Sequence, residues 1–212
     1  MKPAPSLLLP LVVATLCSFG ASVALAAETP AAPKVDLAKG QATATAVCVA
    51  CHGFDGSRGS PANPILQGQH SEYLVKQLIE FKSGARNNPI MKGMAAGLSE
   101  DDMRNVAAFY ASKQAKPGFA KNKDSAALGE KVYRGGIAER SIPACAGCHS
   151  PTGAGIPSQY PRLAGQHGDY TEAQLVGFRS AARNNSTVMT GVAAKMNDRE
   201  IKAVADYIAG LR

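Results

Sequence analysis

The sequence predicts an all-α protein made of two tandem domains of the same fold. One observation is an internal repeat, because many residues of the first half recur 97 positions later. A second is the helical spacing of apolar residues behind residues that favour helix starts. A third is the scarcity of runs that alternate polar and apolar residues with the period of a β-strand. Duplication of one helical domain of about 90 residues accounts for all three observations.

Polar residues mark the expected helix starts in chain order. Asp36 and Ser71 are each placed to cap a helix of the first half. The run Ser99-Glu100-Asp101-Asp102 resembles a capping box, and Asn197-Asp198-Arg199-Glu200 opens the matching helix of the second half. The segments between helices that are rich in Gly and Pro are expected to be loops, namely 53–69 and 151–166.

The N-terminal residues have the features of a secretory signal. Lys2 supplies a basic start, Leu7–Ala14 form a short apolar run, and Ala24-Leu25-Ala26 is a cleavage site of the A-x-A type. We therefore expect a signal peptide at residues 1–27. The apolar run is too short for a convincing membrane span, and no later stretch is long and apolar enough to form one.

The domain boundaries follow from the repeat and from a segment of linker composition. Residues 114–127 contain a Pro-Gly pair and several lysines, which is typical of a connection between domains. We expect the first domain at 28–116, the linker at 117–124 and the second domain at 125–212.

A Cys-x-x-Cys-His pattern occurs once in each domain, as Cys48-Val49-Ala50-Cys51-His52 and Cys145-Ala146-Gly147-Cys148-His149. This pattern is the attachment site of c-type haem. Its spacing places two thiols along one edge of a porphyrin, where they add to the vinyl groups, and it lets the histidine reach the iron. We therefore predict two covalently bound haem c groups, with His52 and His149 as iron ligands.

Two other readings of the cysteine pairs are weaker. A thioredoxin-like dithiol needs a βαβ context that the sequence lacks. A structural zinc site would have to combine two pairs that lie 97 residues apart. Neither reading explains the histidine that follows each pair.

The cysteines also indicate the compartment. Cys17 falls in the predicted signal peptide, so the four remaining cysteines all belong to the two motifs. An oxidising compartment would otherwise pair them as disulfides. Export with haem attachment therefore indicates a bacterial periplasm.

The formal net charge of +7 does not predict a nucleic-acid partner. Residues 28–117 carry a net +2 and residues 118–212 a net +4. Four haem propionates would offset most of this charge. Because the sequence has no dense basic run, we interpret the Lys and Arg residues as a solvated surface.

The repeat selects among methionines for the second iron ligand. With the offset of 98 that holds in this part of the chain, Met91 aligns with Met189, and both lie in Met-x-Gly. Met94, Met103 and Met196 align with other residue types, so we expect them to pack in the core. Methionine ligation raises the potential and closes the iron to substrates.

Two histidines compete with this choice. His70 and His167 also repeat, each 18 residues after its motif histidine. They could ligate iron, or they could form hydrogen bonds at a junction between loop and helix. The spacing leaves both roles open.

Two prolines are candidates for orienting the ligand histidines. Pro64 and Pro161 repeat, and a backbone carbonyl at each could accept a hydrogen bond from the ligand histidine. The alternative is that both prolines only shape a loop.

In these features the chain resembles the cytochrome c4 family, whose members consist of two class I cytochrome c domains. The resemblance covers nearly all of the chain after residue 27. It rests on the paired Cys-x-x-Cys-His motifs, on Pro-x-Leu-x-Gly-Gln at Pro64–Gln69 and Pro161–Gln166, and on Met-x-Gly at Met91 and Met189. It implies His/Met ligation in both domains, haems near a pseudo-two-fold interface, and the Pro64 and Pro161 carbonyls as partners of the ligand histidines. Met94, close to Met91, stays an alternative ligand.

The resemblance also implies a function. We expect an electron carrier and not an enzyme, with a quinol-oxidising complex or a dehydrogenase as donor and a terminal oxidase as acceptor. The expected carrier is soluble or peripherally attached to the membrane. One alternative is the dihaem subunit of a flavocytochrome sulfide dehydrogenase, and a weaker one is a dihaem peroxidase, which would need an open iron.

Overall fold

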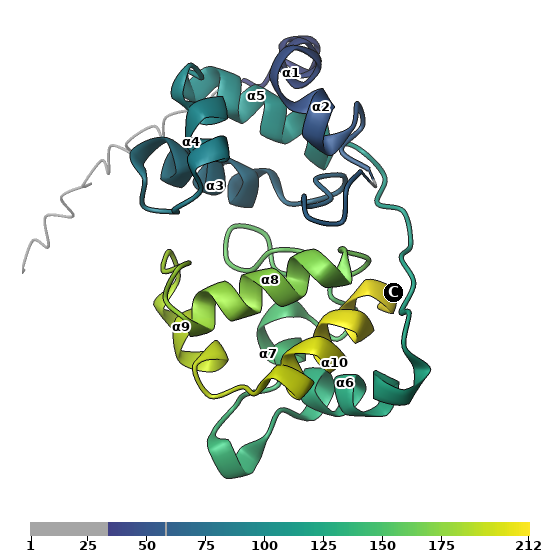
Figure 1. The fold of residues 1–212 in the computed structure, drawn as a ribbon. Coiled ribbons are helices and arrows are strands. Elements are labelled where there is room, and N and C mark those ends of the chain that lie inside the picture. Colours follow the sequence, from purple (N-terminus) through teal and green to yellow (C-terminus); the bar gives the residue numbers. More distant parts are fainter. Residues whose placement is uncertain (1–33, 58) are drawn as a thin grey trace, which may run out of the picture. The chain divides into compact units, whose positions relative to one another are not determined.

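The computed structural model describes residues 34–57 and 59–212, so the predicted signal peptide lies outside the described residues. Helices joined by loops make up the described chain (Figure 1). Their bounds are α1 (Leu37–Thr43), the π-helix η1 (Ala44–Cys48), α2 (Val49–His52), α3 (Ser71–Ser83), α4 (Pro89–Ala96), α5 (Glu100–Ala111), α6 (Lys123–Gly135), the 3₁₀ helix η2 (Ala138–Arg140), α7 (Cys145–His149), α8 (Gly168–Arg179), α9 (Thr187–Ala193) and α10 (Asp198–Gly210).

The all-α prediction is confirmed. In the described segments, β-type pairing is limited to two isolated bridges, Ile137 with Ile142 and Ile156 with Tyr160. The first of these closes an extra turn between α6 and α7, in the part of the second half that has no counterpart in the first. Within residues 34–57 and 59–212, no helix combines the length and apolarity that crossing a bilayer requires.

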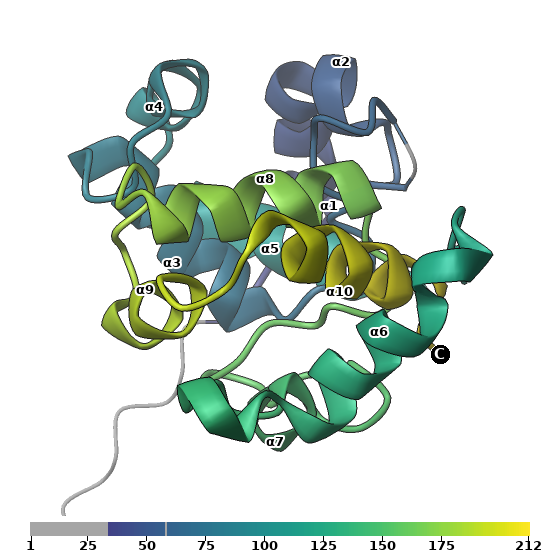
Figure 2. The same cartoon turned by 60° about the horizontal axis from the view of Figure 1, so that its bottom comes forward.

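Each half is built on a close crossing of its first and last helices. In the first half α1 packs against α5 (Figure 1), and in the second half α6 packs against α10 (Figure 2). A glycine stands at each crossing. A Cβ atom added at Gly40 would lie 2.2 Å from the Asn105 carbonyl oxygen, and one at Gly129 would lie 2.3 Å from that of Ala203. Only a residue without a side chain allows the two backbones to approach this closely.

Three of the four predicted helix starts are confirmed. Asp36 accepts hydrogen bonds from the first amides of α1, and capping boxes open α5 at Ser99 and α10 at Asn197. The prediction for Ser71 is wrong, because the N-cap position of α3 lies one residue earlier, at His70. The His70 carbonyl already accepts the amide of Leu74, so Ser71 is the first residue inside the helix.

The expected linker overlaps a helix. Helix α6 begins at Lys123, capped by the side chain of Asn122, so the last two residues of the predicted linker are helical. The Asp206 carboxylate on α10 accepts hydrogen bonds from the amides of Lys121 (2.7 Å) and Asn122 (3.0 Å). These bonds hold the start of α6 against α10 and explain why the helix begins inside a segment of linker composition.

Apolar side chains fill a core in each half. The core of the first half gathers side chains from α3, α4 and α5, and that of the second half gathers them from α6, α8 and α10. Met103 and Met196 are buried in these cores, as predicted. Met94 is 46% exposed, so its predicted place in the core is wrong. It lies on the solvent side of the short helix α4, where little packs against it.

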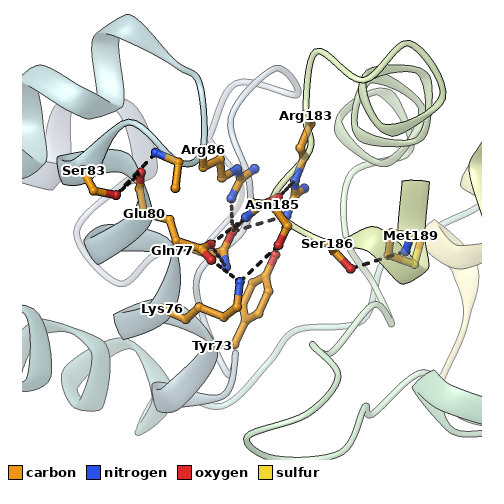
Figure 3. A network of polar contacts seen from close by, with 11 residues as sticks. Tyr73, Lys76, Gln77, Glu80, Ser83, Arg86, Arg183, Asn185, Ser186 and Met189 are labelled. Carbon is orange, nitrogen blue, oxygen red and sulfur yellow. Dashed lines mark hydrogen bonds and ion pairs between the residues drawn. The ribbon is translucent and has the colours of Figure 1, made fainter. Parts of the chain in front are cut away.

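A network of polar side chains links the two halves (Figure 3). The Arg86 guanidinium donates to the Tyr170 hydroxyl at 3.0 Å, and the Arg183 guanidinium donates to the Tyr73 hydroxyl at 3.1 Å. Both arginines also donate to the Gln174 amide oxygen, at 2.8 and 2.7 Å. Because Arg86 with Arg183 and Tyr73 with Tyr170 are repeat pairs, the same contact is made twice, once in each direction.

Candidate haem-binding sites

The first Cys-x-x-Cys-His motif lies where two short helices join. Cys48 ends the π-helix η1, and Cys51 and His52 belong to α2. His52 is buried, and its Nδ1 lies 3.0 Å from the Pro64 carbonyl oxygen, which comes from the loop before α3. The side chain is therefore oriented by a backbone atom 12 residues further along the chain.

The second motif repeats this geometry on one helix. Helix α7 holds Cys145, Cys148 and His149. His149 is buried like its counterpart, and its Nδ1 lies 3.0 Å from the Pro161 carbonyl oxygen. The hydrogen bonds expected for the two prolines are thus present in both halves.

The carbonyl partners determine which nitrogen of each histidine is available to a metal. A carbonyl oxygen only accepts, so Nδ1 must carry the proton and Nε2 keeps its lone pair. Burial lowers the pKa of His52 and His149, and the hydrogen bond to proline opposes this only in part. Each imidazole is therefore neutral, in the tautomer that binds a metal through Nε2.

The cysteine side chains suit covalent attachment better than redox exchange. Cys48, Cys51, Cys145 and Cys148 form no disulfide. Burial raises the pKa of the Cys48 thiol and raises that of Cys145 to about 11. A dithiol that exchanges with disulfides needs a lowered pKa, so these environments disfavour the thioredoxin-like reading. In the segments that the structure describes, no cluster of three or more Cys, His, Asp or Glu side chains forms a metal site, as a shared zinc would need.

Met91 and Met189 occupy the same position in two matching helices. The Asn88 side chain caps α4 and accepts the Met91 amide at 3.0 Å, and the Ser186 hydroxyl caps α9 and accepts the Met189 amide at 3.3 Å. Each methionine is therefore the third residue of its helix. Both are half-buried and pack at the edge of their half's core. A half-buried thioether held by a capped helix is available to a group bound beside the core.

The competing side chains differ from this pair. Met103 and Met196 are enclosed by the cores, and Met94 faces solvent. His70 and His167 occupy the N-cap positions of α3 and α8, at the junction of loop and helix, and neither side chain makes a capping hydrogen bond. The His70 Nε2 lies 2.9 Å from the Ala154 carbonyl oxygen of the second half, so this ring already has a structural role.

One residue near the second site was not predicted from the sequence. The Tyr160 ring lies edge-on to the His149 ring, with 5.6 Å between their centroids. At the corresponding position of the first half, the Asn63 side chain donates to the Cys51 carbonyl oxygen at 3.0 Å. The environments of the two motif histidines therefore differ in their aromatic content.

Comparison with known proteins identifies the domains. The cytochrome c family matches this chain twice, over residues 37–113 and 126–212. Each match contains one Cys-x-x-Cys-His motif and one of the paired methionines.

Several characterised proteins are similar over most of their length. A cytochrome c4 of Thiocapsa roseopersicina is 45% identical over 186 residues, which are 85% of this chain and 96% of that protein. A thiosulfate dehydrogenase electron acceptor of Stutzerimonas stutzeri is 37% identical over 195 residues, which are 89% of this chain and 90% of that protein. The crystal structure of reduced cytochrome c4 from Pseudomonas stutzeri superposes with a TM-score of 0.80 at 40% identity, covering 84% of this chain and all of that one.

Proposed function

Because the chain belongs to the cytochrome c4 family, we propose which of its atoms hold each haem and where its electrons go. The chain is a dihaem electron carrier with two covalently bound haem c groups. What the family leaves open is the ligand set of each iron in this chain, the compartment and the partners.

The attachment sites follow the two motifs. The thiols of Cys48 and Cys51 hold the first haem through thioether bonds, and those of Cys145 and Cys148 hold the second. His52 and Met91 are the ligands of the first iron, and His149 and Met189 those of the second. When bound, haem c supplies a one-electron change between ferric and ferrous iron.

The observation that carries the ligand assignment is the matched geometry of the two halves. Each ligand histidine keeps Nε2 free because a proline carbonyl accepts from Nδ1 at 3.0 Å. Each methionine is fixed at the third position of a capped helix. Held by one fixed histidine and one fixed methionine, each iron would have no open position for a substrate, and these side chains would not need to move between the oxidised and reduced states. This favours the carrier over the peroxidase alternative.

The proposed compartment rests on the predicted signal peptide and the two haem motifs, and the proposed partners rest on the relatives. The carrier works in the periplasm, receives electrons from a quinol-oxidising complex or a dehydrogenase, and delivers them to a terminal oxidase. A dehydrogenase as donor is supported by the similarity to a thiosulfate dehydrogenase electron acceptor. The net charges of +2 and +4 on the two halves are modest, which suits brief partner contacts.

Spectroscopic redox titration of methionine variants tests the ligand assignment. The sulfur-to-iron band of the oxidised holoprotein should lose about half its intensity in Met91→Leu and in Met189→Leu, because each iron contributes one such bond. Met94→Leu, a neighbouring methionine of α4, is the matched control and should keep the full band. A full band in Met91→Leu with loss in Met94→Leu would assign the ligand to Met94 instead.

A second experiment tests the acceptor. Reduced holoprotein should be reoxidised by membranes that contain a cytochrome oxidase, and cyanide should stop the reaction. Failure of reoxidation by active membranes, with the haem ligands intact, would refute the terminal oxidase as acceptor.

A further inference from the structure

Two glutamines make reciprocal contacts between the halves. The Gln166 side chain pairs with both backbone groups of Ile65: its Oε1 accepts from the amide at 2.9 Å, and its Nε2 donates to the carbonyl at 3.0 Å. The Gln69 side chain pairs in the same way with Arg162, at 2.9 Å for both bonds. Gln69 with Gln166 and Ile65 with Arg162 are repeat pairs, so the contact is made once in each direction.

The orientation of each amide is fixed by a second donor. The Gln69 Oε1 also accepts from the His70 amide at 3.0 Å, and the Gln166 Oε1 accepts from the His167 amide at 3.0 Å. An oxygen, and not a nitrogen, must therefore face the amide of the residue that follows each proline. Gln69 is buried, and Gln166 is half-buried.

These contacts fall on the peptide group that orients a ligand histidine. The amide of Ile65 and the carbonyl of Pro64 belong to one peptide unit, and that carbonyl accepts from His52 Nδ1 at 3.0 Å. The amide of Arg162 and the carbonyl of Pro161 form the corresponding unit beside His149. Each ligand histidine is thus connected, through a single peptide, to a glutamine of the other half.

A hydrogen bond on one side of a peptide changes the other side. When the N–H donates, the peptide is polarised and its carbonyl becomes a stronger acceptor. A stronger acceptor on Nδ1 makes the imidazole more basic at Nε2. A more basic ligand favours the ferric over the ferrous state, which lowers the reduction potential.

We propose that Gln166 and Gln69 are crossed positioning residues: each lowers the reduction potential of the haem held by the other half, through the proline peptide that orients the ligand histidine. This inference rests on the proposed ligands His52 and His149. Its consequence is that contact between the halves helps to set how an electron divides between the two haems.

Methionine substitutions at Gln69 and Gln166 test whether each glutamine acts on the haem of the other half. Methionine keeps the length of the side chain and removes both hydrogen bonds. In Gln166→Met, the ratio of reduced first haem to reduced second haem at half reduction should rise by up to about twofold, the factor that corresponds to 10–30% of a typical net hydrogen-bond energy. In Gln69→Met, the ratio should fall by a similar factor.

Gln174→Met is the matched control. This glutamine also lies between the halves, where both Arg86 and Arg183 donate to it, but it makes no bond to either proline peptide. It should leave the ratio within measurement error. An equal change of the ratio in all three variants, or no change in Gln69→Met and Gln166→Met, would overturn the proposal. The two glutamines would then have a packing role only.

A readout independent of the potential is the Nδ1 proton of each ligand histidine. Proton NMR of the reduced holoprotein should show the His52 Nδ1 proton moving upfield in Gln166→Met and unchanged in Gln174→Met, because its acceptor is weakened only in the former. Gln166→Glu retains an acceptor for the Ile65 amide, so it keeps the variant set informative if Gln166→Met folds poorly. Gln166→Glu should move the His52 Nδ1 proton downfield, and an upfield shift in this variant would also refute the proposed effect of Gln166.

The same spectra distinguish failure of the proposed iron ligands from failure of the proposed glutamine effect. If wild-type holoprotein had no imidazole of His52 or His149 on an iron, both the proposed ligands and the proposed effect of the glutamines would fail. If both imidazoles were coordinated but the glutamine variants did not shift the Nδ1 proton of the other half's histidine, only the proposed effect of the glutamines would fail.

Discussion

Glu200 shows how one carboxylate can hold two elements together. At the start of α10, its Oε2 accepts from the Asn197 amide at 3.0 Å, which completes a capping box. Its Oε1 pairs with Arg140 from the 3₁₀ helix η2, and Arg140 also donates to the Lys195 carbonyl at 2.9 Å. Burial raises the pKa of Glu200, but the hydrogen bonds from Arg140 and Asn197 outweigh burial and leave the pKa lowered.

The substitution Glu200→Gln should therefore destabilise the protein in a pH-dependent way. At pH 7 the free energy of unfolding should fall by about 1.5–3 kcal/mol, the range for hydrogen bonds to a charged group. Because the folded pKa is lowered, the wild-type advantage is complete above the ordinary glutamate pKa of about 4.3 and is lost as the pH falls from there through the folded pKa. Denaturant unfolding of both holoproteins between pH 3 and 7 measures the difference.

The exposed ion pair of Glu130 with Arg134 provides the control for Glu200. Glu130→Gln should change the free energy of unfolding by less than about 0.5 kcal/mol at any pH, since exposed pairs contribute little. A cost for Glu200→Gln that does not shrink in acid would show that the lost contact is not that of a carboxylate.

Whether a residue's role could be predicted depended on whether it repeats. The bonds of Pro64 and Pro161 to the motif histidines could be anticipated, because both halves carry the same residue at the same spacing. The contact of Tyr160 with His149 could not, because the first half has Asn63 there and a difference between repeats suggests no role. The bonds from Gln69 and Gln166 escaped prediction for another reason: they join the halves, and sequence spacing carries no information about that contact.

At the scale of elements, the crossing of α6 and α10 depends on the absence of a single side chain. The Cβ of an alanine at position 129 would meet backbone, the Ala203 carbonyl oxygen at 2.3 Å, and the Tyr207 Cβ at 2.7 Å. Backbone atoms cannot rotate away, so the two helices would have to separate. Gly129→Ala should lower the free energy of unfolding by about 1–3 kcal/mol, the usual cost of overpacking.

Gly135, at the end of the same helix, is the matched control. A Cβ added there has no neighbour within 4 Å. Gly135→Ala should be neutral or stabilise the protein by up to about 1 kcal/mol, because alanine has the higher helix propensity. Thermal unfolding of the two holoproteins at one pH compares them. Equal effects at positions 129 and 135 would contradict the close crossing as the cause.

The two cores show why the repeat predicts the positions of helices better than it predicts which side chains fill the core. When the halves are aligned on Gly40 and Gly129, Ala44 corresponds to Tyr133, and all four residues are buried. In the first half the large ring near this place comes from the last helix, as Tyr110 of α5, whereas in the second half it comes from the first helix, as Tyr133 of α6. The first half therefore combines Ala44 with Tyr110, and the second half combines Tyr133 with Ile208, so the alignment of one element alone does not reveal which helix supplies the ring.

At the scale of the whole molecule, the first half holds the start of a helix in the second. The Asn185 side chain donates to Gln77 at 3.0 Å and to Glu80 at 2.7 Å, both on α3, as Figure 3 shows. Asn185 directly precedes Ser186, whose hydroxyl caps α9 and accepts the amide of Met189. Its counterpart Asn87, before the cap of α4, is exposed. The helix that presents Met189 is therefore braced across the halves, and the matching helix of the first half has no such brace from Asn87.

This asymmetry predicts unequal stability of the two proposed methionine bonds. Asn185→Ala removes two hydrogen bonds to α3, so the start of α9 should open more often, and added imidazole should displace Met189 from oxidised iron about three- to tenfold faster, for a loss of about 1 kcal/mol. Asn87→Ala should leave the rate of displacement of Met91 within about twofold of the wild-type rate, because an exposed side chain contributes little.

Stopped-flow loss of the sulfur-to-iron band measures both displacement rates, with the phases assigned by Met91→Leu and Met189→Leu. Similar acceleration in the two variants would mean that local helix capping, and not contact between the halves, holds the ligand, and the second half would then keep its iron ligands without help from the first.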